Sequence, residues 1–116
     1  MVACGSPARC RWGQKAFGYL LGSDDQTWQA WDASARLRAG RGPVGPDGRP
    51  LPLLVDQGSA DPFLASELKP EALEAAAAAS DHPLTLRRQA GYDHSFFFVS
   101  SFIDDHLRHH AAALLS

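Results

Sequence analysis

The sequence predicts an α/β fold, in which helices cover a parallel sheet. Two short apolar segments, 51–57 and 83–89, have the length and composition of strands. A helical pattern over 63–80 separates them, and strands that are joined through a helix pair in parallel. Parallel sheets usually contain more than two strands and are covered on both faces. We therefore expect an incomplete sheet that forms one end of a larger fold.

The part of the chain before the first strand is predicted to be mostly helical. Residues 1–11 contain Gly, Pro and Arg with little periodicity, so we expect an irregular leader. Residues 12–22 fit a short helix that ends at Gly22. Residues 23–40 fit a second helix, because acids follow the candidate N-cap Ser23 and arginines precede the final glycine.

The middle of the chain is predicted to contain a loop, a strand and a helix. Residues 41–50 are rich in glycine and proline, which is typical of a loop. The strand expected at 51–57 is continuously apolar, as in strands buried on both faces of a parallel sheet, and Pro52 suits its beginning. The alanine-rich segment 63–80 is predicted to be helical, with Pro70 in the first turn of its second part.

The end of the chain is predicted to contain the second strand and a long helix. Residues 83–89 alternate leucine with polar side chains, which is the pattern of a strand. Residues 95–115 are predicted to be helical, with one apolar stripe along the helix. The stripe consists of Val99, Phe102, Ile103 and Leu107.

Length, composition and charge limit the classes of function. With 116 residues the chain is long enough for one domain and too short for two. Its net charge of −2 and its scattered basic residues give no reason to expect nucleic acid or an anionic membrane as a partner. The first residues lack the apolar segment of a signal peptide. We therefore expect a cytoplasmic protein in which Cys4 and Cys10 are reduced thiols.

Ionisable side chains follow both predicted strands. Asp61 lies in the loop after the first strand, and Asp93 and His94 lie in the loop after the second. Loops at the carboxyl ends of neighbouring parallel strands adjoin one another, so Asp61 can reach His94. A carboxylate that accepts a hydrogen bond from imidazole Nδ1 leaves Nε2 as a general base. The pattern alone favours the alternative, a turn-forming aspartate and a structural or surface histidine.

Three segments contain more specific motifs. They are CRWGQKAFGYLLGSD, LLVDQGSADPFLASELKPEAL and LRRQAGYDHSFFFVSSFIDDHLRHHA. In this order and spacing they resemble the C-terminal part of the S-formylglutathione hydrolase family of serine esterases, also called esterase D. WGQKAF, and GYDHS followed by aromatic residues, are specific to that family. The resemblance implies a single partial α/β-hydrolase domain over 1–116, with 12–116 as the C-terminal hydrolase segment.

The resemblance also implies roles for particular residues. The family has a Ser–Asp–His triad in that chain order, so the acid falls on Asp61 and the base on His94. The aromatic run at 96–99 would anchor the His94 loop in the core. Trp12 would either line the cleft for the thioester or pack beneath its loop. Arg11 stands where the family usually has proline.

The implied reaction is hydrolysis of S-formylglutathione to formate and glutathione, the second step of glutathione-dependent formaldehyde detoxification. It needs neither a metal nor an organic cofactor, because the nucleophile is a side chain. No serine of this chain has glycine at both −2 and +2, so the G-x-S-x-G nucleophile is absent. Three explanations stay open: a fragment of a full-length hydrolase, an inactive degenerate product, or half of a split enzyme. The expected partners are the thioester substrate and either a second copy or a missing N-terminal half.

The last predicted helix offers a different pattern. His106 and His110 are four residues apart, a spacing that can chelate zinc. The helix lacks the glutamate of the H-E-x-x-H arrangement, so the favoured interpretation is that these histidines face solvent. We therefore predict no metal site. The sheet edge where further strands would pair is expected to promote dimerisation or aggregation.

Overall fold

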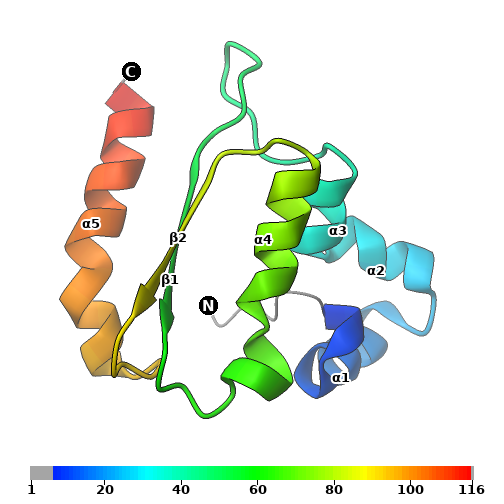
Figure 1. The fold of residues 1–116 in the computed structure, drawn as a ribbon. Helices are drawn as coiled ribbons and strands as arrows, with labels where there is room; N and C mark the ends of the chain where they lie inside the picture. Colours follow the sequence, from blue (N-terminus) through cyan, green and yellow to red (C-terminus); the bar gives the residue numbers. More distant parts are fainter. Residues whose placement is uncertain (1–6, 116) are drawn as a thin grey trace.

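The computed structural model describes residues 7–115 and contains a two-stranded parallel sheet with helices on both sides (Figure 1). Strand β1 spans Leu53–Gly58 and strand β2 spans Leu84–Gln89, close to the predicted bounds. The register pairs Asp56 with Arg87 near the middle of the sheet. The α/β class and the parallel pairing are therefore confirmed.

Short helical elements precede β1. They are the 3-10 turn Pro7–Arg9 and the helices α1 (Arg11–Leu21), α2 (Asp25–Trp31) and α3 (Ala33–Arg38). Helical structure thus begins inside the segment that was expected to be an irregular leader. The first part of that leader, residues 1–6, lies outside the described residues.

The single helix predicted over 23–40 is wrong, because Asp32 divides it. This residue has extended backbone angles, φ −80° and ψ 116°, and it ends α2. Its side chain accepts a hydrogen bond from the backbone N–H of Ser34 at 2.8 Å, which makes Asp32 the N-cap of α3. The N-cap of α2 is Asp24 rather than Ser23.

Two elements replace the single helix predicted between the strands. A π-helical turn, Leu64–Leu68, is followed by Lys69, which adopts a left-handed conformation with φ 44°. Helix α4 then spans Pro70–Ala79. Proline occupies the first position of this helix, as predicted, where its missing N–H breaks no helical hydrogen bond.

The hydrophobic core lies between α3, α4 and the sheet. Helices α1 to α4 lie on one side of the sheet, and α5 (Phe96–Leu115) lies on the other (Figure 1). The small side chains of α4 allow close packing against α3. The buried residues of the core are Leu37, Ala76 and Ala77, against which the half-buried Leu53, Leu73 and Leu84 pack.

The bounds of α5 agree with the prediction, and its apolar stripe is mostly exposed. Phe102 packs edge-on against Tyr92, with ring centroids 5.1 Å apart. The other positions of the predicted stripe are exposed: Val99, Ile103 and Leu107. A sheet of two strands leaves this face of the helix uncovered.

Polar side chains attach α5 to the sheet. The side chain of Asp56 is only 3% exposed, and it accepts hydrogen bonds from Arg87 Nε at 2.8 Å and from Arg87 Nη2 at 2.6 Å. His106 Nε2 lies 2.8 Å from the same carboxylate, and Arg87 Nη1 lies 2.8 Å from Asp105. The interpretation that these histidines face solvent is therefore wrong for His106.

The environment of Asp56 determines its charge. Burial raises the pKa of this carboxyl, but hydrogen bonds from Arg87, Gln89 and His106 outweigh burial and lower the pKa below the ordinary 3.8. The same pairing raises the pKa of Arg87. Both groups are thus charged at neutral pH.

Within residues 7–115 no cluster of three or more potential metal-ligating side chains occurs.

Two further expectations concern cysteine and the surface. Cys10 is disulfide-bonded, so the prediction of a reduced thiol is wrong at this position, and Cys4 lies outside the described residues. The Cys10 sulfur also accepts a hydrogen bond from Gly13 N at 3.3 Å and caps α1.

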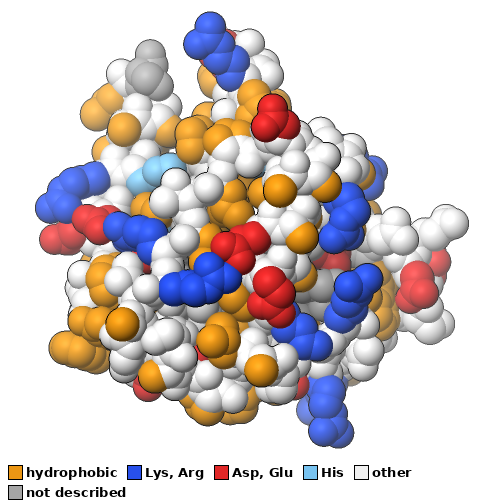
Figure 2. All heavy atoms as spheres, viewed as in Figure 1, with side chains coloured by type: hydrophobic (Ala, Val, Ile, Leu, Met, Phe, Trp, Pro, Cys, Tyr) orange, Lys and Arg blue, Asp and Glu red, His pale blue; other side chains and the backbone are white. Residues whose placement is uncertain are grey.

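Figure 2 shows Lys and Arg side chains scattered among acidic and hydrophobic ones on the face in view. No helix in the described part of the chain is long and apolar enough to span a membrane.

Candidate active site

Asp61 and His94 meet at the carboxyl ends of the two strands. Asp61 follows β1 and His94 follows β2, and His94 Nδ1 lies 2.6 Å from Asp61 Oδ2. The contact that the topology predicted is confirmed. The side chain of Asp61 is 0% exposed, whereas that of His94 is 38% exposed. The acid is thus enclosed by protein and the imidazole is open on one side.

Backbone geometry fixes the buried carboxylate of Asp61. Its Oδ1 accepts a hydrogen bond from Phe63 N at 2.9 Å, and its carbonyl accepts one from Leu64 N at 3.1 Å. The second contact leads into the π-helical turn, an element that is often found at functional sites. One carboxylate oxygen therefore bonds to the turn while the other bonds to His94.

The loop that contains His94 packs tightly against the end of β1. Ala60 N donates to Tyr92 O at 2.9 Å, and Gly91 N donates to Ser59 Oγ at 3.1 Å. A Cβ atom at Gly58 would lie only 2.2 Å from Tyr92 O, so any larger residue there would push the loops apart. This close approach brings His94 within reach of the acid.

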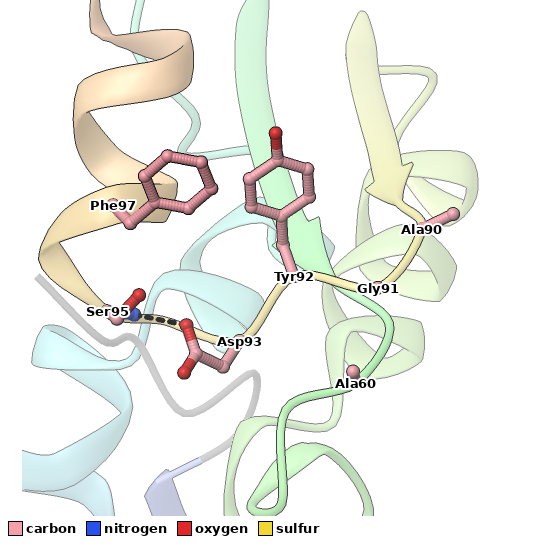
Figure 3. Close-up of a pocket in the computed structure, with 7 residues that line it drawn as sticks. All are labelled: Ala60, Ala90, Gly91, Tyr92, Asp93, Ser95 and Phe97. Carbon is pink, nitrogen blue, oxygen red and sulfur yellow. Dashed lines mark hydrogen bonds between the residues drawn. The ribbon is translucent and has the colours of Figure 1, made fainter.

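Asp93 has a separate role from its neighbour His94. Its Oδ1 accepts a hydrogen bond from Ser95 N at 2.7 Å at the start of α5. Hydrogen bonds from the side chain and backbone of Ser95 lower the pKa of Asp93. Figure 3 shows this contact among residues that line a hollow. The volume of the hollow is about 350 Å³. The hollow is lined by Ala60, Ala90, Gly91, Tyr92, Asp93, Ser95 and Phe97.

The aromatic run after His94 does not anchor its loop in the way that we expected. Phe96 is 88% exposed and Phe97 is also mostly exposed, so neither inserts into a core. Instead, three rings pack against the ring of Tyr92, with centroids 5.6, 5.9 and 5.1 Å away: Phe97, Phe98 and Phe102. Tyr92 therefore provides the main aromatic contact between this loop and α5.

A row of aromatic rings adjoins His94, with Phe63 beside the imidazole and Trp12 beside Phe63. The rings of Phe63 and His94 have centroids 5.8 Å apart, and those of Trp12 and Phe63 are 4.6 Å apart. The buried Glu67 accepts a hydrogen bond from Trp12 N at 2.9 Å through its Oε2. Sequence reasoning missed Phe63 and Glu67. The two residues lie two and six positions after Asp61, but nothing in the sequence marks their contacts with α1.

The chemistry of the two groups sets the direction of their hydrogen bond. An ionised carboxylate only accepts hydrogen bonds, so His94 Nδ1 donates to Asp61 and Nε2 of the neutral ring has a lone pair. Among the described residues no group is hydrogen-bonded to that Nε2. The arrangement can therefore take a proton from a nucleophile and return it to a leaving group.

Comparison with known proteins identifies the family. A family model described as "Putative esterase" matches residues 1–109. The chain belongs to the esterase family. This esterase-family chain is 43% identical over 110 residues to S-formylglutathione hydrolase of Bos taurus, a match that covers 94% of the chain and 37% of the relative.

A solved structure is similar over nearly the whole described fold. It comes from a structural and kinetic study of an S-formylglutathione hydrolase from Agrobacterium tumefaciens, and the TM-score is 0.84 at 37% identity. The match covers 97% of this esterase-family chain and 38% of the other chain. The chain therefore corresponds to a part of an α/β hydrolase and spans less than two fifths of the length of these relatives.

Proposed function

We propose that this chain supplies the acid and the base of a serine thioesterase that hydrolyses S-formylglutathione to formate and glutathione. The observation that supports it best is the 2.6 Å contact between buried Asp61 and half-exposed His94. Both relatives described above are named S-formylglutathione hydrolases. The nucleophilic serine would come from the part of the hydrolase that this sequence does not contain.

The proposed reaction uses His94 twice. His94 Nε2 takes the proton of the serine hydroxyl as its oxygen attacks the thioester carbonyl, and it then protonates the departing glutathione thiolate. A water molecule next attacks the formyl-enzyme while His94 accepts its proton, and His94 returns that proton to the serine oxygen as the ester bond breaks and formate leaves. Asp61 holds the imidazole in the required tautomer and stabilises the imidazolium. No metal or organic cofactor takes part.

Trp12 is proposed to contribute to the substrate cleft. It lies at the start of α1, 43% exposed, and its ring packs against Phe63 next to His94.

The proposed compartment is the cytoplasm, where glutathione is the main soluble thiol. The proposed compartment rests on the substrate alone, because Cys10 is disulfide-bonded and the expected reduced thiol no longer supports it.

A chimeric enzyme tests the proposed function. In it, this chain replaces the matching segment of the Agrobacterium tumefaciens hydrolase, whose remaining residues complete the fold. We expect turnover of S-formylglutathione that survives a metal chelator. His94→Ala should lower kcat by about 10⁶-fold and Asp61→Asn by roughly 10⁴-fold, as for other serine hydrolase triads.

The matched control is His110→Ala, the same substitution at an exposed histidine of α5. It should leave kcat within about twofold of the parent chimera, as surface substitutions do. A folded chimera without turnover, or turnover that is indifferent to His94→Ala, would refute the proposal. The chain alone should show no activity above that of its own His94→Ala variant.

The exposed apolar side chains of α5 favour one alternative. Phe96, Ile103 and Leu107 leave a hydrophobic surface open, as in a catalytically inactive hydrolase remnant that acts by association with a second copy or another chain. An inactive chimera with an intact fold would support this candidate over the thioesterase.

A further inference from the structure

Phe63 contacts both members of the acid–base pair. Its backbone N–H donates to Asp61 Oδ1 at 2.9 Å, and its ring lies 5.8 Å from the ring of His94 at an interplanar angle of 48°. The same ring packs on Trp12 at 4.6 Å. One residue thus bonds to the acid through its backbone and packs against the base through its side chain.

We infer that Phe63 is a positioning residue, whose ring holds the His94 imidazole in the plane that keeps Nδ1 bonded to Asp61. The inference deepens the proposed function, on which it rests, because it concerns the same pair. The His94 ring is 38% exposed, so core packing does not fix its orientation. A tilted aromatic neighbour restricts rotation of such a ring about its Cα–Cβ and Cβ–Cγ bonds.

The contacts of Phe63 argue against a purely structural role. Its side chain is not part of the core of Leu37, Ala76 and Ala77, and the residue is 37% exposed. Its ring contacts are Trp12 and His94. A substitution there should therefore change the histidine more than it changes the stability of the fold.

Glu67 extends this arrangement to α1. Its buried carboxylate accepts the N–H of Trp12, which fixes the first turn of that helix against the π-helical turn. Trp12 in turn covers the face of Phe63 with a ring at 51°. The ring that contacts His94 is thus itself held on one side by an anchored tryptophan.

The experiment measures the imidazole itself, by nitrogen-15 NMR of the whole 116-residue chain, with His94→Gln to assign its signals. The readouts are the fraction of neutral His94 that carries its proton on Nδ1 and the rate at which that proton exchanges with water. In Phe63→Leu we expect exchange to be roughly fivefold faster, given the usual energy of an aromatic contact. Phe63→Tyr keeps the ring and should match the parent chain.

The matched control is Phe17→Leu, because Phe17 is also a half-buried ring packed on a tryptophan, Trp28, at 5.8 Å. This control should leave both readouts of His94 unchanged. Unchanged readouts in folded Phe63→Leu, or equal changes in Phe63→Leu and Phe17→Leu, would overturn the inference. An inactive chimera would not alter these readouts, so this inference and the proposed function fail separately.

Discussion

The carboxylate of Asp61 takes part in two hydrogen bonds, one at each oxygen, and a single orientation of the side chain must serve both. Oδ1 caps the turn through Phe63 N, and this fixes the direction in which Oδ2 points toward His94. The Asp61 side chain is closed to solvent, so a carboxylate there that lacked either partner would lose a charge-assisted bond that solvent could not replace. Capping of the turn and the proposed orientation of His94 are therefore compatible uses of one side chain.

Gly58 is the position where a single methyl group should matter most for the site. We expect Gly58→Ala to destabilise the chain by about 2–3 kcal/mol, because the new Cβ would lie 2.2 Å from Tyr92 O and backbone would have to move. Urea unfolding at pH 7 measures the change. The His94 signals described above should shift as the loops separate.

Gly18→Ala is the matched control for this substitution. In that part of α1 the nearest atom to a new Cβ is Trp28 Cζ2 at 4.0 Å, so no clash occurs. A helical glycine that accepts alanine without strain gains roughly 0.5–1 kcal/mol of stability. Equal effects of the two substitutions would contradict the close packing at Gly58.

The topology made a contact between Asp61 and His94 possible, but the pattern alone favoured a turn-forming aspartate and a structural or surface histidine, and only the resemblance assigned the pair the roles of acid and base. Two apolar strands separated by a helix place the loops of Asp61 and His94 at one edge of the sheet. The supporting contacts of Phe63 and Glu67 were not predictable in the same way. They depend on how α1 folds back onto the turn, and that tertiary contact leaves no periodic pattern in the sequence.

Helix α5 is attached to the sheet mainly through charge. Asp56 lies in an otherwise apolar strand and pairs in register with Arg87, and His106 and Asp105 of α5 complete the group. The isolated acid in LLVDQ was the signal for this cluster in the sequence. The cluster itself was not predicted.

The pH dependence of stability should reveal this attachment. The folded-state pKa of Asp56 is below 3.8, so its contribution is complete above the unfolded pKa of about 3.9 and is lost as pH falls through the folded pKa. We expect Asp56→Asn to cost about 2–3 kcal/mol at pH 7. The difference from the parent chain should shrink as pH falls from about 4 to 2.

Urea unfolding at several pH values measures that difference, with Asp104→Asn as the control. Asp104 is an exposed acid of α5. Its substitution should change stability by less than about 0.5 kcal/mol at every pH. A constant difference between the parent chain and Asp56→Asn across this pH range would show that the carboxylate is not held as described.

The molecule as a whole leaves much apolar surface uncovered. The exposed stripe on α5 is formed by apolar side chains spaced three, four or seven residues apart, which places them on one side of a helix: Phe96, Val99, Ile103, Leu107 and Leu114. The topology indicated that the sheet would be incomplete, and this was predictable by counting strands. The helix faces that stay exposed beside an incomplete sheet were not predictable, because their exposure depends on the width of the sheet.

Introducing charge into that stripe should keep the chain in solution at higher concentration. We expect the pair Ile103→Lys and Leu107→Lys to raise severalfold the concentration at which light scattering increases, because exposed apolar patches drive association. The control pair, Ser101→Lys with Ala112→Lys, adds the same charge at exposed positions off the stripe. Equal improvement by both pairs would mean that net charge, rather than the stripe, governs solubility.

The charged attachment of α5 also fixes its rotation about its own axis. Phe102, Asp105, His106 and His109 lie on one side of the helix, and their partners are Tyr92, Arg87, Asp56 and the carbonyl of Pro52. An apolar contact tolerates a slide of one residue, but such a slide turns a helix by about 100° and would break all the polar contacts together. These polar contacts therefore fix the rotation of α5 relative to the strands. The direction in which its exposed apolar stripe points depends on Asp56.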